Sequence, residues 1–204
     1  MTRHVIAALL AFSAAAATAQ PVDIQPTVDT PEQRQSLRTL TSCLIQQRPR
    51  WARQTLAQPY LSQSQARIAS YVLSGRDTCV TRPEVEVTFR TSSLVASLAE
   101  HYVRTEIGDV DLARLTNALN TVTPLNVSED FALCVVSRNP VAARTLTLSA
   151  FGSTEETAAA QQLASGVPPC TNRGENLTVD LQALRALSAT ALYRAVSSLR
   201  TATN

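Results

Sequence analysis

The chain has 204 residues, which suits one domain or two small ones, and it carries 18 basic and 16 acidic residues. All of the basic residues are arginine, and they form no run longer than the spaced Arg48, Arg50 and Arg53. Proteins that bind nucleic acid cluster positive charge in order to neutralise phosphates. The near balance of charge therefore argues against a nucleic-acid-binding protein.

The first nineteen residues have the pattern of a secretory signal. Arg3 and His4 precede an apolar stretch at 5–16, and Ala-Thr-Ala at 17–19 is typical of a cleavage site, which leaves Gln20 as the mature N-terminus. The stretch is too short to span a membrane, and no later segment has the roughly 18 apolar residues that spanning requires. We expect a periplasmic or secreted protein with no membrane span, whose residues 20–29 form a flexible tail.

Four cysteines occur, at Cys43, Cys79, Cys134 and Cys170. An even number in an exported chain predicts two disulfides, and the absence of a CxxC motif disfavours a redox or zinc site. Both Cys43 to Cys79 and Cys134 to Cys170 span the same number of positions. The pairing that preserves this spacing is Cys43–Cys79 and Cys134–Cys170, although the sequence leaves the two other connectivities open.

The cysteines belong to a longer internal match. A shift of 91 residues superimposes both cysteines, one proline, one Ala-Arg pair and one Ser-Gly pair, and a shift of 90 fits better after the second cysteine. The matching pairs are Pro49 and Pro140, Ala52 and Ala143, Arg53 and Arg144, Ser74-Gly75 and Ser165-Gly166, Arg82 and Arg173, Leu94 and Leu184, and Arg104 and Arg194. The sequence therefore predicts a tandem duplication.

Each predicted unit reads as four helices, which makes the protein mainly α. Residues 30–108 form the first unit, 109–127 a connecting helix and linker, and 128–204 the second unit. Helices are expected to start at Thr30, at both matched prolines, and at Ser62 and Ser153, where Gln65 and Glu156 complete capping boxes. Gly75 and Gly166 are expected to end helices in the left-handed conformation, and alternating apolar residues at 85–89 and 177–181 indicate a short extended segment in each unit.

The pattern C-x5-P-x2-A-R occurs in both units, at Cys43 and at Cys134, and the second unit closes with Ala-Leu-Tyr-Arg at 191–194. Together these features resemble uncharacterised exported tandem-repeat helical proteins of GC-rich Gram-negative bacteria. The resemblance covers nearly all of the mature chain and implies no known activity. The first unit departs from it at its close, where Glu100 and His101 stand.

His101 is the one histidine left after cleavage of the signal, so any histidine-based catalysis would have to use it. Glu100 precedes it, but adjacent helical residues point about 100° apart and do not form a ready dyad. We interpret His101 as a structural residue on the edge of an apolar face. The alternative is an enzyme that uses Glu100 and His101 in a cleft between the units. No metal-binding spacing or phosphate-binding motif is present, so no cofactor is expected.

Two arginine pairs occur in both units: Arg53 with Arg144, and Arg82 with Arg173. A two-fold site could bring equivalent arginines together around an anion, but we favour a role in covering helix surfaces or capping helix ends. We therefore expect a non-enzymatic binding protein or an envelope-associated scaffold. Its partner would be an envelope protein or a small anionic or apolar ligand.

Overall fold

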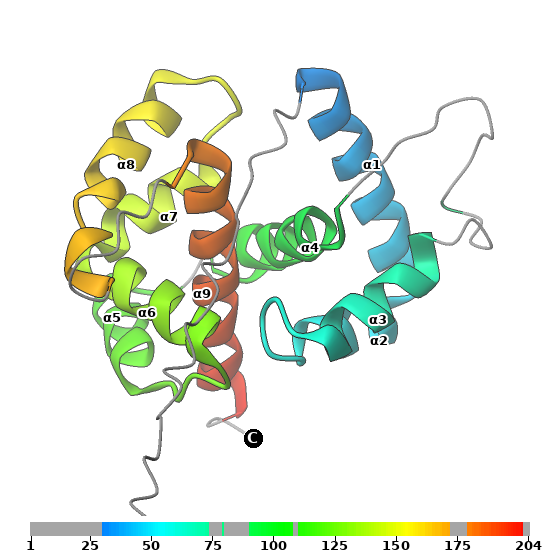
Figure 1. The fold of residues 1–204 in the computed structure, drawn as a ribbon, viewed down its shortest axis with the longest axis horizontal. Coiled ribbons are helices and arrows are strands. Elements are labelled where there is room, and N and C mark those ends of the chain that lie inside the picture. Colours follow the sequence, from blue (N-terminus) through cyan, green and yellow to red (C-terminus); the bar gives the residue numbers. More distant parts are fainter. Residues whose placement is uncertain (1–29, 74–78, 80–89, 108–109, 172–178, 202–204) are drawn as a thin grey trace, which may run out of the picture.

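A computed structural model describes residues 30–73, 79, 90–107, 110–171 and 179–201. This part of the chain is mainly helical, as predicted (Figure 1). Its elements, in chain order, are α1 Pro31–Gln47, α2 Pro49–Leu56, α3 Gln63–Leu73, α4 Thr91–Glu106, α5 Leu112–Thr121, α6 Val127–Arg138, α7 Pro140–Leu148, α8 Thr154–Ala164, the 3₁₀ turn Pro168–Cys170 and α9 Leu181–Thr201.

The predicted helix starts are confirmed where the structure describes them, but two predicted capping boxes are only half formed. The Ser62 and Ser153 hydroxyls accept from the N–H three residues on, whereas the Gln65 and Glu156 side chains accept from the residue before the cap.

The Thr30 hydroxyl accepts a hydrogen bond from the Gln33 backbone, and the Gln33 side chain accepts one from the Thr30 N–H, which completes a capping box. Pro49 and Pro140 each occupy the first turn of a helix. A proline has no N–H to satisfy and its φ already suits a helix, so it fits this position and separates each helix from the one before it.

The predicted extended segments find no support. The described residues contain no strand, and Leu181 is the first residue of α9 rather than part of an extended segment. The Asp180 carboxylate accepts a hydrogen bond from the Ala183 N–H, so the helix begins here. The segment 85–89, like the predicted signal and tail, lies outside the described residues.

The predicted role of Gly166 is wrong. Among the described glycines only Gly152 has a positive φ, so Gly166 does not end α8 in the left-handed conformation. A Cβ on Gly166 would lie 3.2 Å from the Leu163 carbonyl oxygen and 3.3 Å from that of Val135. Glycine is therefore favoured here, because a Cβ would be tight against both carbonyl oxygens, one of which belongs to α6. Gly75 lies outside the described residues.

Two central helices, α4 and α9, make the most extensive contact in the molecule. In Figure 1, α1, α2 and α3 lie on one side of this pair and α5 to α8 on the other. The core is formed by leucine, valine and alanine side chains, with Leu94 and Leu98 of α4 and Leu192 of α9 fully buried. Across the described residues, no helix is both long and apolar enough to cross a membrane.

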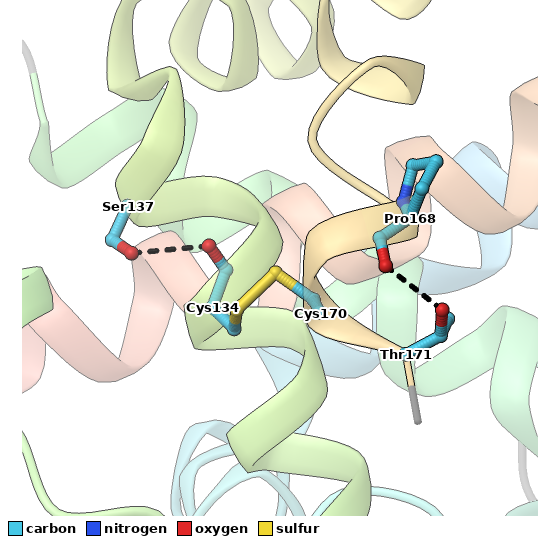
Figure 2. The surroundings of a disulfide bond; sticks show 5 residues. All are labelled: Cys134, Ser137, Pro168, Cys170 and Thr171. Atoms are coloured by element: carbon cyan, nitrogen blue, oxygen red, sulfur yellow. Dashed lines mark hydrogen bonds between the residues drawn. A yellow bond between two sulfur atoms is a disulfide. The ribbon is translucent and has the colours of Figure 1, made fainter. Parts of the chain in front are cut away.

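Both predicted disulfides are present. Cys43 of α1 bonds to Cys79, and Cys134 of α6 bonds to Cys170 in the 3₁₀ turn, each across a separation of 36 residues. Figure 2 shows how the second bond fastens α6 to the segment that follows α8. Each disulfide therefore closes one loop within one predicted unit, and neither links the two units.

Leu61, between α2 and α3, has a φ of 60°, which is left-handed backbone that a leucine rarely adopts. The equivalent position between α7 and α8 is Gly152, with a φ of 73°. Leu61 is also 43% exposed, so little burial offsets this conformational cost.

We expect Leu61→Gly to raise the free energy of unfolding by about 1 kcal/mol, because glycine adopts this backbone without the steric cost. Denaturant unfolding measures the change. Gly152→Ala is the matched control and should lower stability by about 1 kcal/mol, since its new Cβ meets no atom within 4 Å and only the backbone is strained. A loss of stability in Leu61→Gly would contradict this interpretation.

Candidate functional site

Glu100 of α4 lies at the centre of a buried cluster of charged side chains between the two predicted units. Its Oε1 accepts hydrogen bonds from Arg104 Nε at 2.9 Å, from Arg185 Nη2 at 3.0 Å and from Arg38 Nη2 at 3.3 Å. Its Oε2 accepts one from Arg185 Nε at 3.0 Å. The three arginines come from α1, α4 and α9, so a single carboxylate ties three helices together.

Arg185 of α9 is the most deeply buried arginine of the cluster, with 5% of its surface exposed. Besides its two bonds to Glu100, it donates from Nη1 to Glu156 Oε1 at 2.7 Å. Its Nη2 also donates to the carbonyl oxygens of Thr147 and Ser149 at the end of α7. Every nitrogen of the guanidinium thus has an acceptor, which a buried cation requires.

Arg104 and Phe151 complete the surroundings of the charged cluster. Arg104 donates to the carbonyl oxygens of Leu148 and Ser149 at 2.7 and 2.9 Å, so the C-terminal end of α7 faces positive charge. The Phe151 ring lies 4.0 Å from the guanidinium carbon of Arg38 and 4.2 Å from that of Arg185. These are cation–π contacts, and they add to the attraction between α1 and the α7–α8 loop.

The charge state of Glu100 follows from this geometry. Burial is the largest single influence and favours the protonated acid, but the hydrogen bonds and charges of Arg185 and Arg104 together outweigh it. The pKa of Glu100 therefore lies below its ordinary value, and the residue is ionised at neutral pH. A carboxylate bound by three arginines is poorly suited to accept a proton as a general base.

The lowered pKa of Glu100 predicts a pH dependence of stability. Its stabilising contribution is fully present above the unfolded pKa of about 4.3 and is lost as pH falls through the lower folded pKa. The free energy of unfolding, measured by denaturant titration at a series of acidic pH values, should fall less steeply in Glu100→Gln than in the wild type. Parallel curves for the two proteins would contradict the assignment.

His101 does not join this cluster. Its ring makes an edge contact with the Tyr102 ring at 6.0 Å, and no hydrogen bond in the described part of the chain links it to Glu100. Burial lowers the pKa of His101, against the opposing charge of Glu106, so the ring is neutral at pH 7. Within the described residues, no three His, Cys, Asp or Glu side chains are placed to hold a metal ion.

The arginines singled out by the duplication have separate partners. Arg53 donates to Glu106 at 3.0 Å and lies 4.6 Å from the Tyr102 ring, whereas Arg144 donates to the Val110 carbonyl oxygen at 3.2 Å. Their different contacts give no support to a shared anion site. Arg82 and Arg173 lie outside the described residues.

A second polar contact joins the predicted units around Glu129 of α6. The Glu129 carboxylate accepts hydrogen bonds from the backbone N–H groups of Tyr60 at 3.0 Å and Leu125 at 2.8 Å. The Asn126 side chain donates to the Tyr60 carbonyl oxygen at 2.7 Å. Next to this contact is a narrow cavity of about 10 Å³, which Arg194 of α9 also lines.

The sequence did not indicate the importance of Arg185, Glu129 or Glu156. Glu156 was expected only to complete a capping box at a helix start, which explains its place in the chain but not its burial. Arg185 offered a signal: it lies on the face of α9 that carries Leu181 and Leu192, where it interrupts an apolar pattern. A charge on such a face predicts a buried partner.

Comparison with protein-family models, curated proteins and solved structures finds no match for this chain.

Proposed function

We propose that the protein is an exported, non-enzymatic scaffold or binding protein built from two tandem helical units. The observation that carries this proposal is the state of Glu100. This carboxylate, the neighbour of the one histidine of the mature chain, is bound by three arginines and holds α1, α4 and α9 together. Its role is therefore structural, and a rigid junction between two units suits a scaffold.

Matching local contacts support the duplication. The Ser62 hydroxyl accepts from the Gln65 N–H, and the Ser153 hydroxyl accepts from the Glu156 N–H at the same distance of 3.1 Å. Gln65 in turn accepts from the Leu61 N–H, as Glu156 does from that of Gly152. The two disulfides close loops of equal length, and α1 to α4 follow one another in the same order as α6 to α9.

The disulfides also support export, because such bonds form and persist in oxidising compartments. The intact mass of protein purified from the periplasmic or extracellular fraction tests this part of the proposal. We expect a chain that begins at Gln20 and contains two disulfides. A chain that retains its first nineteen residues in the cytoplasm would overturn it.

The scaffold role is tested by crosslinking in intact cells, with tagged wild type and His101→Ala. Circular dichroism and thermal unfolding first establish that the variant folds. We expect both proteins to give the same discrete adduct with an envelope component, because His101 has no part in the junction. A folded His101→Ala variant that loses the biological activity of the wild type would contradict the non-enzymatic proposal.

A further inference from the structure

The two polar contacts between the units are equivalent under the proposed duplication, on which this inference rests. Each position of the Arg185 cluster has a counterpart around the cavity near Glu129. The equivalent pairs are Arg185 and Val95, Glu100 and Thr190, Glu156 and Gln65, Arg104 and Arg194, Phe151 and Tyr60, and Arg38 and Glu129. All six counterparts line the cavity. Five of them lie in the chain segments that the shifts of 90 and 91 already match, and the exception is Glu129, the counterpart of Arg38.

Three buried charges have been exchanged as a set. Arg185 forms ion pairs with both Glu100 and Glu156, and the counterparts of these three residues, Val95, Thr190 and Gln65, are all uncharged. Removing only one partner of a buried ion pair leaves an uncompensated charge, which costs several kcal/mol. The coordinated exchange avoids this cost. It also leaves less side-chain volume, since valine and threonine stand where an arginine and a glutamate stand in the other unit.

Arg194 is the group most affected by the exchange. Its equivalent, Arg104, donates from Nε to Glu100 one turn earlier on α4. One turn before Arg194 stands Thr190, whose hydroxyl is bonded to the carbonyl oxygens of Ala186 and Leu187. In the described part of the chain, Arg194 Nε is buried and has no hydrogen-bond partner.

Its ion-pair partner lies slightly beyond hydrogen-bond reach. Glu129 Oε2 is 3.6 Å from Arg194 Nε. A buried donor without a hydrogen-bond partner is destabilising, so this arrangement favours a third group that bridges the two. The cavity beside them, at about 10 Å³, has room for about one water molecule.

We propose that this cavity is a binding site for a single ordered water molecule, which accepts a hydrogen bond from Arg194 Nε and donates one to Glu129 Oε2. The same space thus occurs at the two equivalent positions. Around Glu100 it is filled by the Arg185 guanidinium, and near Glu129 it is filled by water. Leu56, Val95 and Leu133 form part of the apolar lining of the cavity.

The test is a high-resolution crystal structure of the full mature chain, together with NMR detection of contacts between the Arg194 Nε–H and long-lived water. We expect one water oxygen within hydrogen-bond distance of both Arg194 Nε and Glu129 Oε2. A dry cavity, a bound organic molecule, or an Arg194 side chain turned out to solvent would each overturn the proposal.

Thr190→Glu supplies the missing carboxylate one turn before Arg194, as Glu100 does for Arg104. We expect this variant to bond directly to Arg194 Nε and to lose the water signal, while the matched control Thr190→Val retains it. A water signal unchanged in a folded Thr190→Glu variant would count against the site. The wild-type measurement does not depend on the folding of any variant. Neither the crystal structure nor the NMR signal depends on whether an envelope partner exists. Failure of the scaffold proposal would therefore be seen separately, in the crosslinking experiment.

Discussion

Replacement of Arg185 by valine should lower the free energy of unfolding by about 3–5 kcal/mol, the usual cost of removing one partner from a buried ion pair. The variant leaves Glu100 and Glu156 buried without the cation that both of them bind. It also removes the donor to the α7 carbonyl oxygens. Denaturant unfolding at neutral pH, followed by circular dichroism, measures the loss.

The equivalent positions around the cavity provide the matched control. The triple variant Arg185→Val, Glu100→Thr, Glu156→Gln copies into the cluster the uncharged set found at Val95, Thr190 and Gln65. It removes both carboxylates that lose their partner Arg185, so it should be more stable than Arg185→Val alone despite carrying more substitutions. A triple variant less stable than the single variant would show that the charges are not coupled as we describe.

Removal of one disulfide, by Cys134→Ala with Cys170→Ala, should lower the free energy of unfolding by about 3–4 kcal/mol on the chain-entropy model. The bond closes a loop across 36 residues and fastens the end of the α8 segment to α6 (Figure 2). Without the disulfide, the unfolded chain gains conformational entropy that the native protein does not gain. Denaturant unfolding of the oxidised wild type and the double variant measures this change.

The other disulfide is an internal control for the same model. Cys43→Ala with Cys79→Ala opens a loop of the same length, so the two double variants should lose similar stability. A much larger loss in one of them would indicate a difference in native packing rather than in loop entropy. No loss in either would contradict the view that these bonds stabilise small helical units.

Local signals in the sequence predicted the helices well. Thr30, Pro49, Pro140 and Ser153 each act through atoms within one helical turn, so their effect does not depend on the rest of the fold. The disulfide pairing was also predictable, because equal spacing in two copies favours one connectivity. Gly166 was misinterpreted since its requirement is a contact with α6, which is distant in the sequence.

The candidate site was harder to predict from the sequence for the same reason. Arg185 and Glu100 are 85 residues apart in the chain, and no local pattern specifies that α4 and α9 pack together. Comparison of the two predicted units was applied to matching residues only. The differences between the units, above all Val95 against Arg185 and Thr190 against Glu100, are where the buried cluster and the cavity lie.

The central claim is that a buried set of charges holds the two proposed units together, and a double-mutant cycle on Arg185 and Glu100 tests it most directly. The free energies of unfolding of the wild type, Arg185→Val, Glu100→Thr and the double variant give the coupling between the two residues. We predict a favourable coupling of about 1–3 kcal/mol. Effects that add to within about 0.5 kcal/mol would contradict the account.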